Sequence, residues 1–153
     1  MIVKKILDED FVNYKVPSMY IAFPSCTFKC GYNLCQNSPL ALSDNIEISA
    51  EDIVARYLNN PISKSFVFAG LEPFDSAEDL FELVGLIRLK TNDDIVVFTG
   101  YYKEEIESYI TDLIKYKNII IKYGRFIPDQ EYHYDNVLGI KLASDNQYAE
   151  KIS

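Results

Sequence analysis

The chain lacks several features that would assign it to a class at once. Its 153 residues include no tryptophan, one histidine and three cysteines. No apolar run reaches 18 residues, so we expect no membrane span, and residues 1–15 lack the apolar centre of a secretory signal. With clustered cysteines and no export signal, we expect a cytoplasmic protein whose thiols are free or bind a metal.

Basic residues are also scarce, since 15 Lys and Arg stand against 23 Asp and Glu and give a net charge of −8. A protein that binds nucleic acid needs a basic surface to neutralise phosphates. The charge balance therefore argues against nucleic acid and against an anionic membrane surface as partners. Apolar residues make up 48% of the chain, which predicts one domain with a sizeable core.

The apolar runs of the chain predict four buried strands, at residues 19–23, 65–69, 95–98 and 118–121. Helices are predicted between them, over residues 49–59, 75–90 and 103–116. Strands that alternate with helices favour a parallel sheet. We divide this single domain, residues 1–153, into a lead-in (1–16), a core (17–143) and a polar tail (144–153).

The helix boundaries carry local signals. Ser49 is a suitable N-cap, with Glu51 and Asp52 in the first turn, where carboxylates favour the helix dipole. Glu72 followed by Pro73 is typical of a second helix start, because proline is favoured at the first helical position. That interpretation needs no ligand at this point of the chain.

All three cysteines, Cys26, Cys30 and Cys35, lie in one loop after the first core strand. Loops at the carboxyl ends of strands are where α/β folds place their chemistry. Three neighbouring thiolates can hold zinc, Cu(I) or an iron–sulfur cluster. A structural zinc site would need a fourth ligand, for which His133 is the only histidine. An iron–sulfur cube would instead keep one iron without a protein ligand, and a disulfide with one odd cysteine is a further alternative.

The spacing C-x3-C-x4-C resembles the cluster loop of radical S-adenosylmethionine (SAM) enzymes, whose pattern is C-x3-C-x2-C. Four further segments, in the right order, resemble one branch of that family, the activating proteins of anaerobic ribonucleotide reductases. These segments are Gly70-Leu71-Glu72-Pro73, Phe98-Thr99-Gly100-Tyr101, Gly124-Arg125-Phe126-Ile127 and Ser144-Asp145-Asn146-Gln147. The resemblance covers about residues 18–148, nearly the whole chain.

The resemblance implies an α/β fold of the radical SAM type, an open partial (βα) barrel of about five to six mostly parallel strands. It implies that Cys26, Cys30 and Cys35 bind three irons of a 4Fe–4S cluster and that the fourth iron binds SAM. It also implies a set of residues that contact the cofactor: Leu34, Cys35, Gln36, Gly70, Leu71, Glu72, Thr99 and Asn146.

The activity that the resemblance implies is that of an activase. An electron from a flavodoxin or ferredoxin would let the cluster cleave SAM, and the resulting 5′-deoxyadenosyl radical would take a hydrogen from a backbone glycine of a partner reductase. Leu71 replaces the second glycine of the family motif, and Tyr123 stands where the branch has an acid. Two alternatives stay open: a zinc- or cluster-stabilised binding protein without activity, and a radical SAM enzyme that acts on another peptide or protein.

Overall fold

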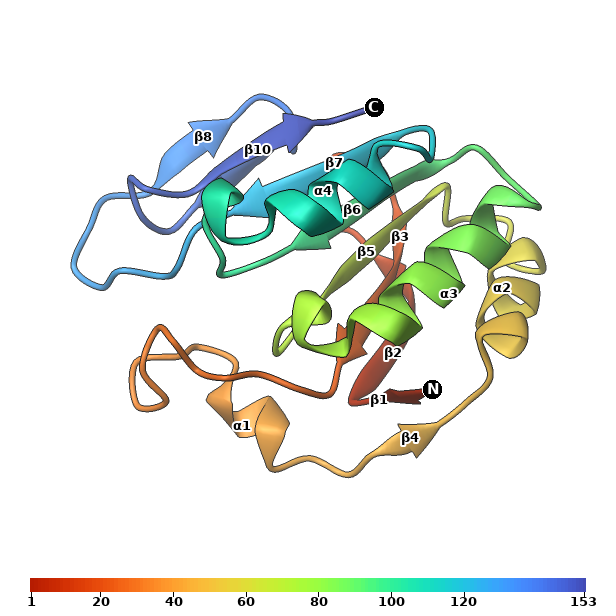
Figure 1. Cartoon of the computed structure of the whole chain (residues 1–153), viewed down its shortest axis with the longest axis horizontal. Coiled ribbons are helices and arrows are strands. Elements are labelled where there is room, and N and C mark those ends of the chain that lie inside the picture. Colours follow the sequence, from red (N-terminus) through yellow and green to blue (C-terminus); the bar gives the residue numbers. More distant parts are fainter.

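The computed structural model describes residues 1–153, and its centre is a six-stranded sheet with the strand order β10-β7-β6-β5-β3-β2 (Figure 1). The four inner strands are parallel neighbours: β3 (Ser18–Phe23), β5 (Ser65–Gly70), β6 (Asp94–Phe98) and β7 (Ile119–Tyr123). Both edges are antiparallel, with β2 (Lys5–Asp10) beside β3 and β10 (Tyr148–Lys151) beside β7. The sheet is therefore mixed.

This mixed sheet shows that the prediction of an open partial (βα) barrel was wrong. A barrel of that type extends by further parallel strands, each reached through a crossover helix. Here the antiparallel strands β2 and β10 occupy the two edges, and antiparallel neighbours need no crossover. The parallel series therefore ends at four strands, and the sheet stays open and flanked on both sides.

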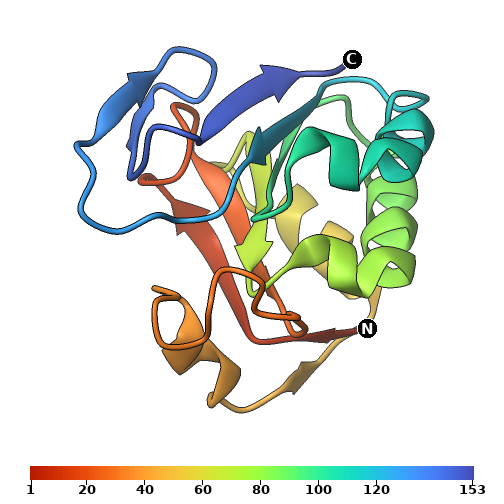
Figure 2. The ribbon, with the colours of Figure 1, turned by 60° about the vertical axis from the view of Figure 1, so that its left-hand side comes forward.

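Helices α2 (Ala50–Leu58), α3 (Ala77–Arg88) and α4 (Glu107–Leu113) lie in the connections between the inner strands. They cover one face of the sheet, as Figure 2 shows. The predicted N-cap of α2 is confirmed, because the Ser49 side chain accepts a hydrogen bond from the Asp52 N–H at 3.0 Å. No helix of the chain is both long enough and apolar enough to cross a bilayer.

Shorter elements complete the connections. The four-residue helix α1 (Ser38–Ala41) follows the cysteine loop, residues 24–37. The 3-10 helices η1 (Pro73–Ser76) and η2 (Lys103–Glu105) come directly before the regions of α3 and α4. Strands β1 (Ile2–Val3) and β4 (Ile46–Glu47) form a small antiparallel pair of their own.

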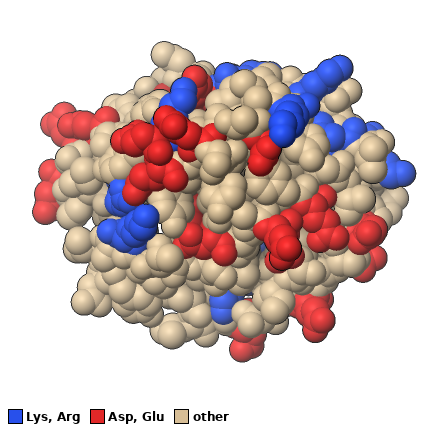
Figure 3. Space-filling view, viewed as in Figure 1, with Lys and Arg blue, Asp and Glu red and all other residues tan.

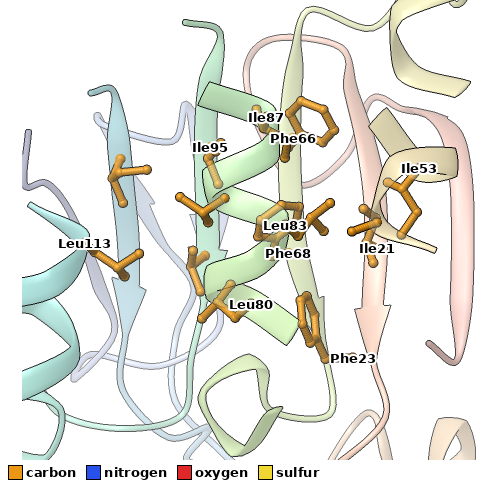
Figure 4. Close-up of a cluster of buried hydrophobic side chains, with 14 of the residues drawn as sticks. Ile21, Phe23, Ile53, Phe66, Phe68, Leu80, Leu83, Ile87, Ile95 and Leu113 are labelled. Carbon is orange, nitrogen blue, oxygen red and sulfur yellow. The ribbon is translucent and has the colours of Figure 1, made fainter. Parts of the chain in front are cut away.

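The main core lies between the sheet and these helices (Figure 4). Alternate residues of each inner strand point into it, such as Ile21 and Phe23 on β3 and Phe66 and Phe68 on β5. Leu83 of α3 is among the helical side chains buried against them. Complete burial of one such side chain stabilises the fold by about 1.5–3 kcal/mol. The buried layer between sheet and helices therefore holds the strands, and with them their ends, in fixed positions.

The opposite face of the sheet has a different cover. Its apolar side chains, Val67, Val96 and Ile120 among them, pack against Tyr14 from the lead-in and Leu138 from a C-terminal hairpin. That hairpin consists of β8 (His133–Asp135) and β9 (Ile140–Leu142). The lead-in and the C-terminal part of the chain thus close the second face.

The surface seen in Figure 3 carries acidic side chains in several separate groups and shows no continuous basic patch. This distribution agrees with the net charge of −8. Figure 3 shows only one face of the molecule, so the absence of a nucleic-acid partner stays a prediction.

Candidate functional site

A cavity of about 310 Å³ lies at the carboxyl ends of the four parallel strands. The cysteine loop forms one wall, and segments 70–72 and 99–101, which follow β5 and β6, form another. Residues 124–126, after β7, and residues 140–143 of the hairpin region complete the lining. Figure 1 shows the cysteine loop and the segment after β7 at the same end of the molecule. Parts of the chain that are far apart in sequence therefore meet here.

Cys26, Cys30 and Cys35 all line this cavity as free, partly exposed thiols, without a disulfide. The Phe28 N–H donates a hydrogen bond to the Cys26 Sγ at 3.1 Å. Burial raises the pKa of Cys26 to about 11 and is the main cause that raises the pKa of Cys30. Without a metal Cys26 and Cys30 are therefore thiols at neutral pH, and a bound metal must displace their protons.

The donor set fits an iron–sulfur cube better than a single ion. No three His, Cys, Asp or Glu side chains of the chain converge closely enough to hold one metal ion. A cube presents its irons at separate corners, so its protein ligands need not meet at one point. His133 does not line the cavity, and its Nε2 lies 2.9 Å from the carbonyl oxygen of Gln147. The structure thus gives no support to His133 as a fourth zinc ligand.

The cysteine loop is fastened to the ends of the strands by hydrogen bonds. The Glu72 N–H donates to the carbonyl oxygen of Ser25 at 2.8 Å, and the Asn37 side chain donates to the carbonyl oxygen of Gly70 at 2.9 Å. The Thr27 N–H donates to the Asp75 carboxylate at 2.8 Å. These bonds place the three sulfurs beside the segment that follows β5.

Gly70 ends β5 at a point where only glycine fits. Its φ is +95°, and a Cβ at this position would lie 2.7 Å from both the Cα and the Cβ of Ala22 on the neighbouring strand. Leu71 has no such constraint, because its φ is not positive. The backbone at the second position of the motif therefore accepts leucine, and Leu71 lines the cavity.

Glu72 is a buried carboxylate that joins the ends of β5 and β6. It accepts hydrogen bonds from the Thr99 hydroxyl at 2.8 Å, the Gly100 N–H at 2.9 Å and the Phe74 N–H at 3.2 Å. Burial raises its pKa to about 7, although these three hydrogen bonds act in the opposite direction. Glu72 therefore fixes the relative positions of the two strand ends that form this wall of the cavity. Its carboxyl group exchanges a proton near neutral pH.

We expect Glu72→Gln to change how stability depends on pH. Because the pKa is raised in the folded protein, the folded state holds this proton up to about pH 7, whereas the unfolded chain loses it near its ordinary value of 4.5. The stability that the protonated carboxyl contributes is complete below about pH 4.5 and is lost as the pH rises through 7. Relative to the variant, the wild type should lose about 3 kcal/mol of unfolding free energy across that window.

The measurement is urea unfolding of both proteins from pH 4 to pH 8. Glu78→Gln, which removes an exposed carboxylate on α3, is the matched control and should leave the pH dependence of the wild type unchanged. If the unfolding free energies of the wild type and Glu72→Gln changed with pH in the same way, the folded protein would not retain the proton of Glu72.

A group of charged side chains closes one side of the cavity. Glu105 accepts two hydrogen bonds from Arg125 Nη2, at 2.6 and 2.8 Å, which lower the pKa of Glu105 to about 2. Lys29 of the cysteine loop lies 3.5 Å from the same carboxylate and over the ring of Tyr101. Arg125 lies over the ring of Tyr102. Glu105 thus connects the cysteine loop with the segment after β7.

The structure brings together most of the residues predicted to contact a cofactor. Those that line the cavity are Cys35, Gln36, Gly70, Leu71, Glu72 and Thr99. Leu34 and Asn146 do not line it: Leu34 is 52% exposed, and the Asn146 side chain donates to the Arg125 carbonyl oxygen at 2.7 Å. Their contact with a cofactor stays a prediction. The sequence-based prediction missed Lys122 and Arg125 among the lining residues.

Three thiols from one loop in one cavity, with no fourth protein ligand, define the class of site found in iron–sulfur proteins. A family model described as a 4Fe–4S single cluster domain matches residues 18–148. The chain therefore belongs to the 4Fe–4S single cluster domain family, which is tied to iron–sulfur proteins of the radical SAM type. A search of curated proteins found no similar sequence.

Proposed function

We propose that this chain is a radical SAM enzyme and that it generates a glycyl radical on an anaerobic ribonucleotide reductase. The observation that carries the proposal is the shared cavity, in which three cysteines face the segments 70–72 and 99–101. Membership in a 4Fe–4S cluster family supports the cluster itself. The motifs that resemble the activase branch support the choice of SAM and of the target.

In this proposal Cys26, Cys30 and Cys35 hold the cluster, and one iron has no protein ligand. When bound, such a cluster supplies the electron that splits SAM into methionine and a 5′-deoxyadenosyl radical, which takes hydrogen from a partner's glycine. The protein positions the reactants and excludes competing reactions. Gly70 allows close approach of the backbone, and Glu72 holds the strand ends that form the wall opposite the cysteines.

The surface around the cysteines supports a protein partner. Tyr32 and Leu34 of the cysteine loop are 44% and 52% exposed, and Leu42 just beyond α1 is 81% exposed. Exposed apolar side chains within one short segment, here residues 32–42, favour a surface that another protein covers. We therefore propose that the reductase docks over the cysteine loop, and that a flavodoxin or ferredoxin delivers the electron.

The chemistry is tested by anaerobic reconstitution with iron and sulfide. We expect a broad brown absorbance that dithionite bleaches, followed by release of 5′-deoxyadenosine when SAM is added, because the electron and the cofactor then meet in one cavity. Liquid chromatography measures the product, and the same sample without dithionite is the control.

Two results would contradict the proposal. One zinc per chain with no uptake of iron would favour the binding protein without activity. A complete cluster that does not cleave SAM under reducing conditions would leave an iron–sulfur protein of another kind. If SAM is cleaved, a neighbouring gene for a large glycyl-radical protein would support the reductase as the target over another peptide.

A further inference from the structure

Lys122 is a buried lysine in the wall of the cavity. It lies on β7, one residue before the strand ends, and is only 7% exposed. Ile119 and Ile121 point into the main core, so strand alternation places Lys122 with Ile120 on the opposite face of the sheet, where the cavity lies. Lysine is almost never buried without a partner.

The bonds that the chain offers do not satisfy this ammonium group. Its Nζ donates one hydrogen bond, to the Gly124 carbonyl oxygen at 3.0 Å, and Lys122 forms no ion pair. An ammonium group carries three donors. The negative charge of Glu72 favours the charged form of Lys122, but its oxygens accept their bonds from Thr99, Gly100 and Phe74.

Gly124 does not depend on Lys122. Its carbonyl oxygen also accepts a hydrogen bond from the Gln147 side chain, at 3.3 Å. Removing the ammonium group would therefore leave no buried backbone oxygen without a partner. A buried charge without a charged partner lowers the stability of the fold. Its presence here therefore favours a function in ligand binding. Burial lowers the pKa of Lys122 to about 8, so the group is mostly charged at neutral pH.

The cavity as a whole is cationic, although the protein is acidic. Its lining includes four cationic side chains, Lys29, Lys122, Arg125 and Lys141, and one carboxylate, that of Glu72. Glu105, outside the lining, forms an ion pair with both Lys29 and Arg125. Lys141 is exposed. Lys122 is therefore the buried positive charge that a ligand in the cavity can reach.

We propose that Lys122 binds an oxyanion of the molecule that occupies this cavity. The inference rests on the proposed function in one respect: if the molecule is SAM, the oxyanion is the carboxylate of its amino-acid part. The other source of the same chemistry is a phosphate group. Charge-assisted hydrogen bonds in a water-poor site are strong enough to select such a ligand.

The test compares three probes on anaerobically reconstituted protein by equilibrium dialysis. S-adenosylhomocysteine carries the amino-acid carboxylate, and 5′-methylthioadenosine is its counterpart without that part. Binding of inorganic phosphate is measured directly and also in competition with the nucleosides. Lys122→Met should lower the affinity for S-adenosylhomocysteine by about tenfold or more, the cost of one charged hydrogen bond. The affinity for 5′-methylthioadenosine should stay within about twofold.

Lys151→Met removes the same charge from an exposed position on the neighbouring strand β10 and should change neither affinity. Urea unfolding without ligand gives a second readout. A role toward a ligand predicts that Lys122→Met is as stable as the wild type or more stable, whereas a purely structural role predicts a loss of stability.

Selective loss of S-adenosylhomocysteine binding supports a carboxylate partner, and selective loss of phosphate competition supports a phosphate partner. An equal loss for both nucleosides would overturn the proposal, and so would unchanged binding of all probes or the absence of any binding to the wild type. If the wild type binds phosphate through Lys122 but neither nucleoside, the proposed function fails and the oxyanion site stands.

Discussion

Cys30→Ala is expected to abolish binding of a complete 4Fe–4S cluster. Cys30 is the middle ligand of the proposed set and lines the cavity with Cys26 and Cys35. The chain has no other cysteine that could replace it. A cube held by two thiolates would expose two irons, and we expect iron and sulfide per chain to fall from about four to near zero. Metal analysis and the visible spectrum after anaerobic reconstitution measure the loss.

The matched control is Tyr32→Phe, two residues further along the same loop. It changes an exposed side chain whose hydroxyl forms no hydrogen bond within the protein, and it should keep the full iron content. Far-ultraviolet circular dichroism of both variants should match the wild type, because the cysteine loop has no regular structure beyond its turns. A complete cluster in Cys30→Ala would remove Cys30 from the ligand set.

Gly70→Ala should destabilise the fold strongly, although it adds only one methyl group. The new Cβ would lie 2.7 Å from the Cα and the Cβ of Ala22, and 2.9 Å from the Phe23 nitrogen. These are mostly backbone atoms of a central strand, so no side-chain rotation relieves the clash. Overpacking together with the positive φ should lower the unfolding free energy by about 2–5 kcal/mol, measured by urea unfolding.

Gly85→Ala is the control for this substitution. Gly85 lies within α3, and a Cβ there would meet only the Tyr116 hydroxyl, at an ordinary contact distance of 3.7 Å. Alanine in place of glycine inside a helix should raise stability by about 0.5–1 kcal/mol. Adding the same methyl group should therefore lower the unfolding free energy at position 70 and raise it at position 85. Gly70→Ala with the stability of the wild type would mean that β3 and β5 separate easily at their ends.

The inner part of the fold was predictable because burial leaves a clear pattern. The runs at 19–23, 65–69, 95–98 and 118–121 are almost entirely apolar, and each coincides with an inner strand within two residues of its ends. The edges gave no such signal. β10 has the sequence Tyr-Ala-Glu-Lys within a polar segment, and only its pairing with β7 makes it a strand. The barrel prediction failed at these edges.

The site was predictable where one residue type carries the chemistry. The three cysteines could be assigned to one loop from their spacing, and Glu72 before Pro73 marks a real helix start as well as a cavity wall, since its side chain caps η1. The interpretation of Glu72 as a helix start is therefore confirmed, and its contact with a cofactor stays a prediction. Lys122 was missed because a lysine after three isoleucines is usually the solvated end of a strand. The one available signal was its position inside a run that is otherwise buried.

The way in which the cysteine loop is attached determines whether the fold depends on the cluster. Hydrogen bonds hold the loop at its two ends, and none of residues 24–37 belongs to either apolar cluster of the fold. We therefore expect the protein to stay folded when oxidation destroys its iron–sulfur cluster. We therefore expect a fresh supply of iron and sulfide to restore the cluster without resynthesis of the polypeptide.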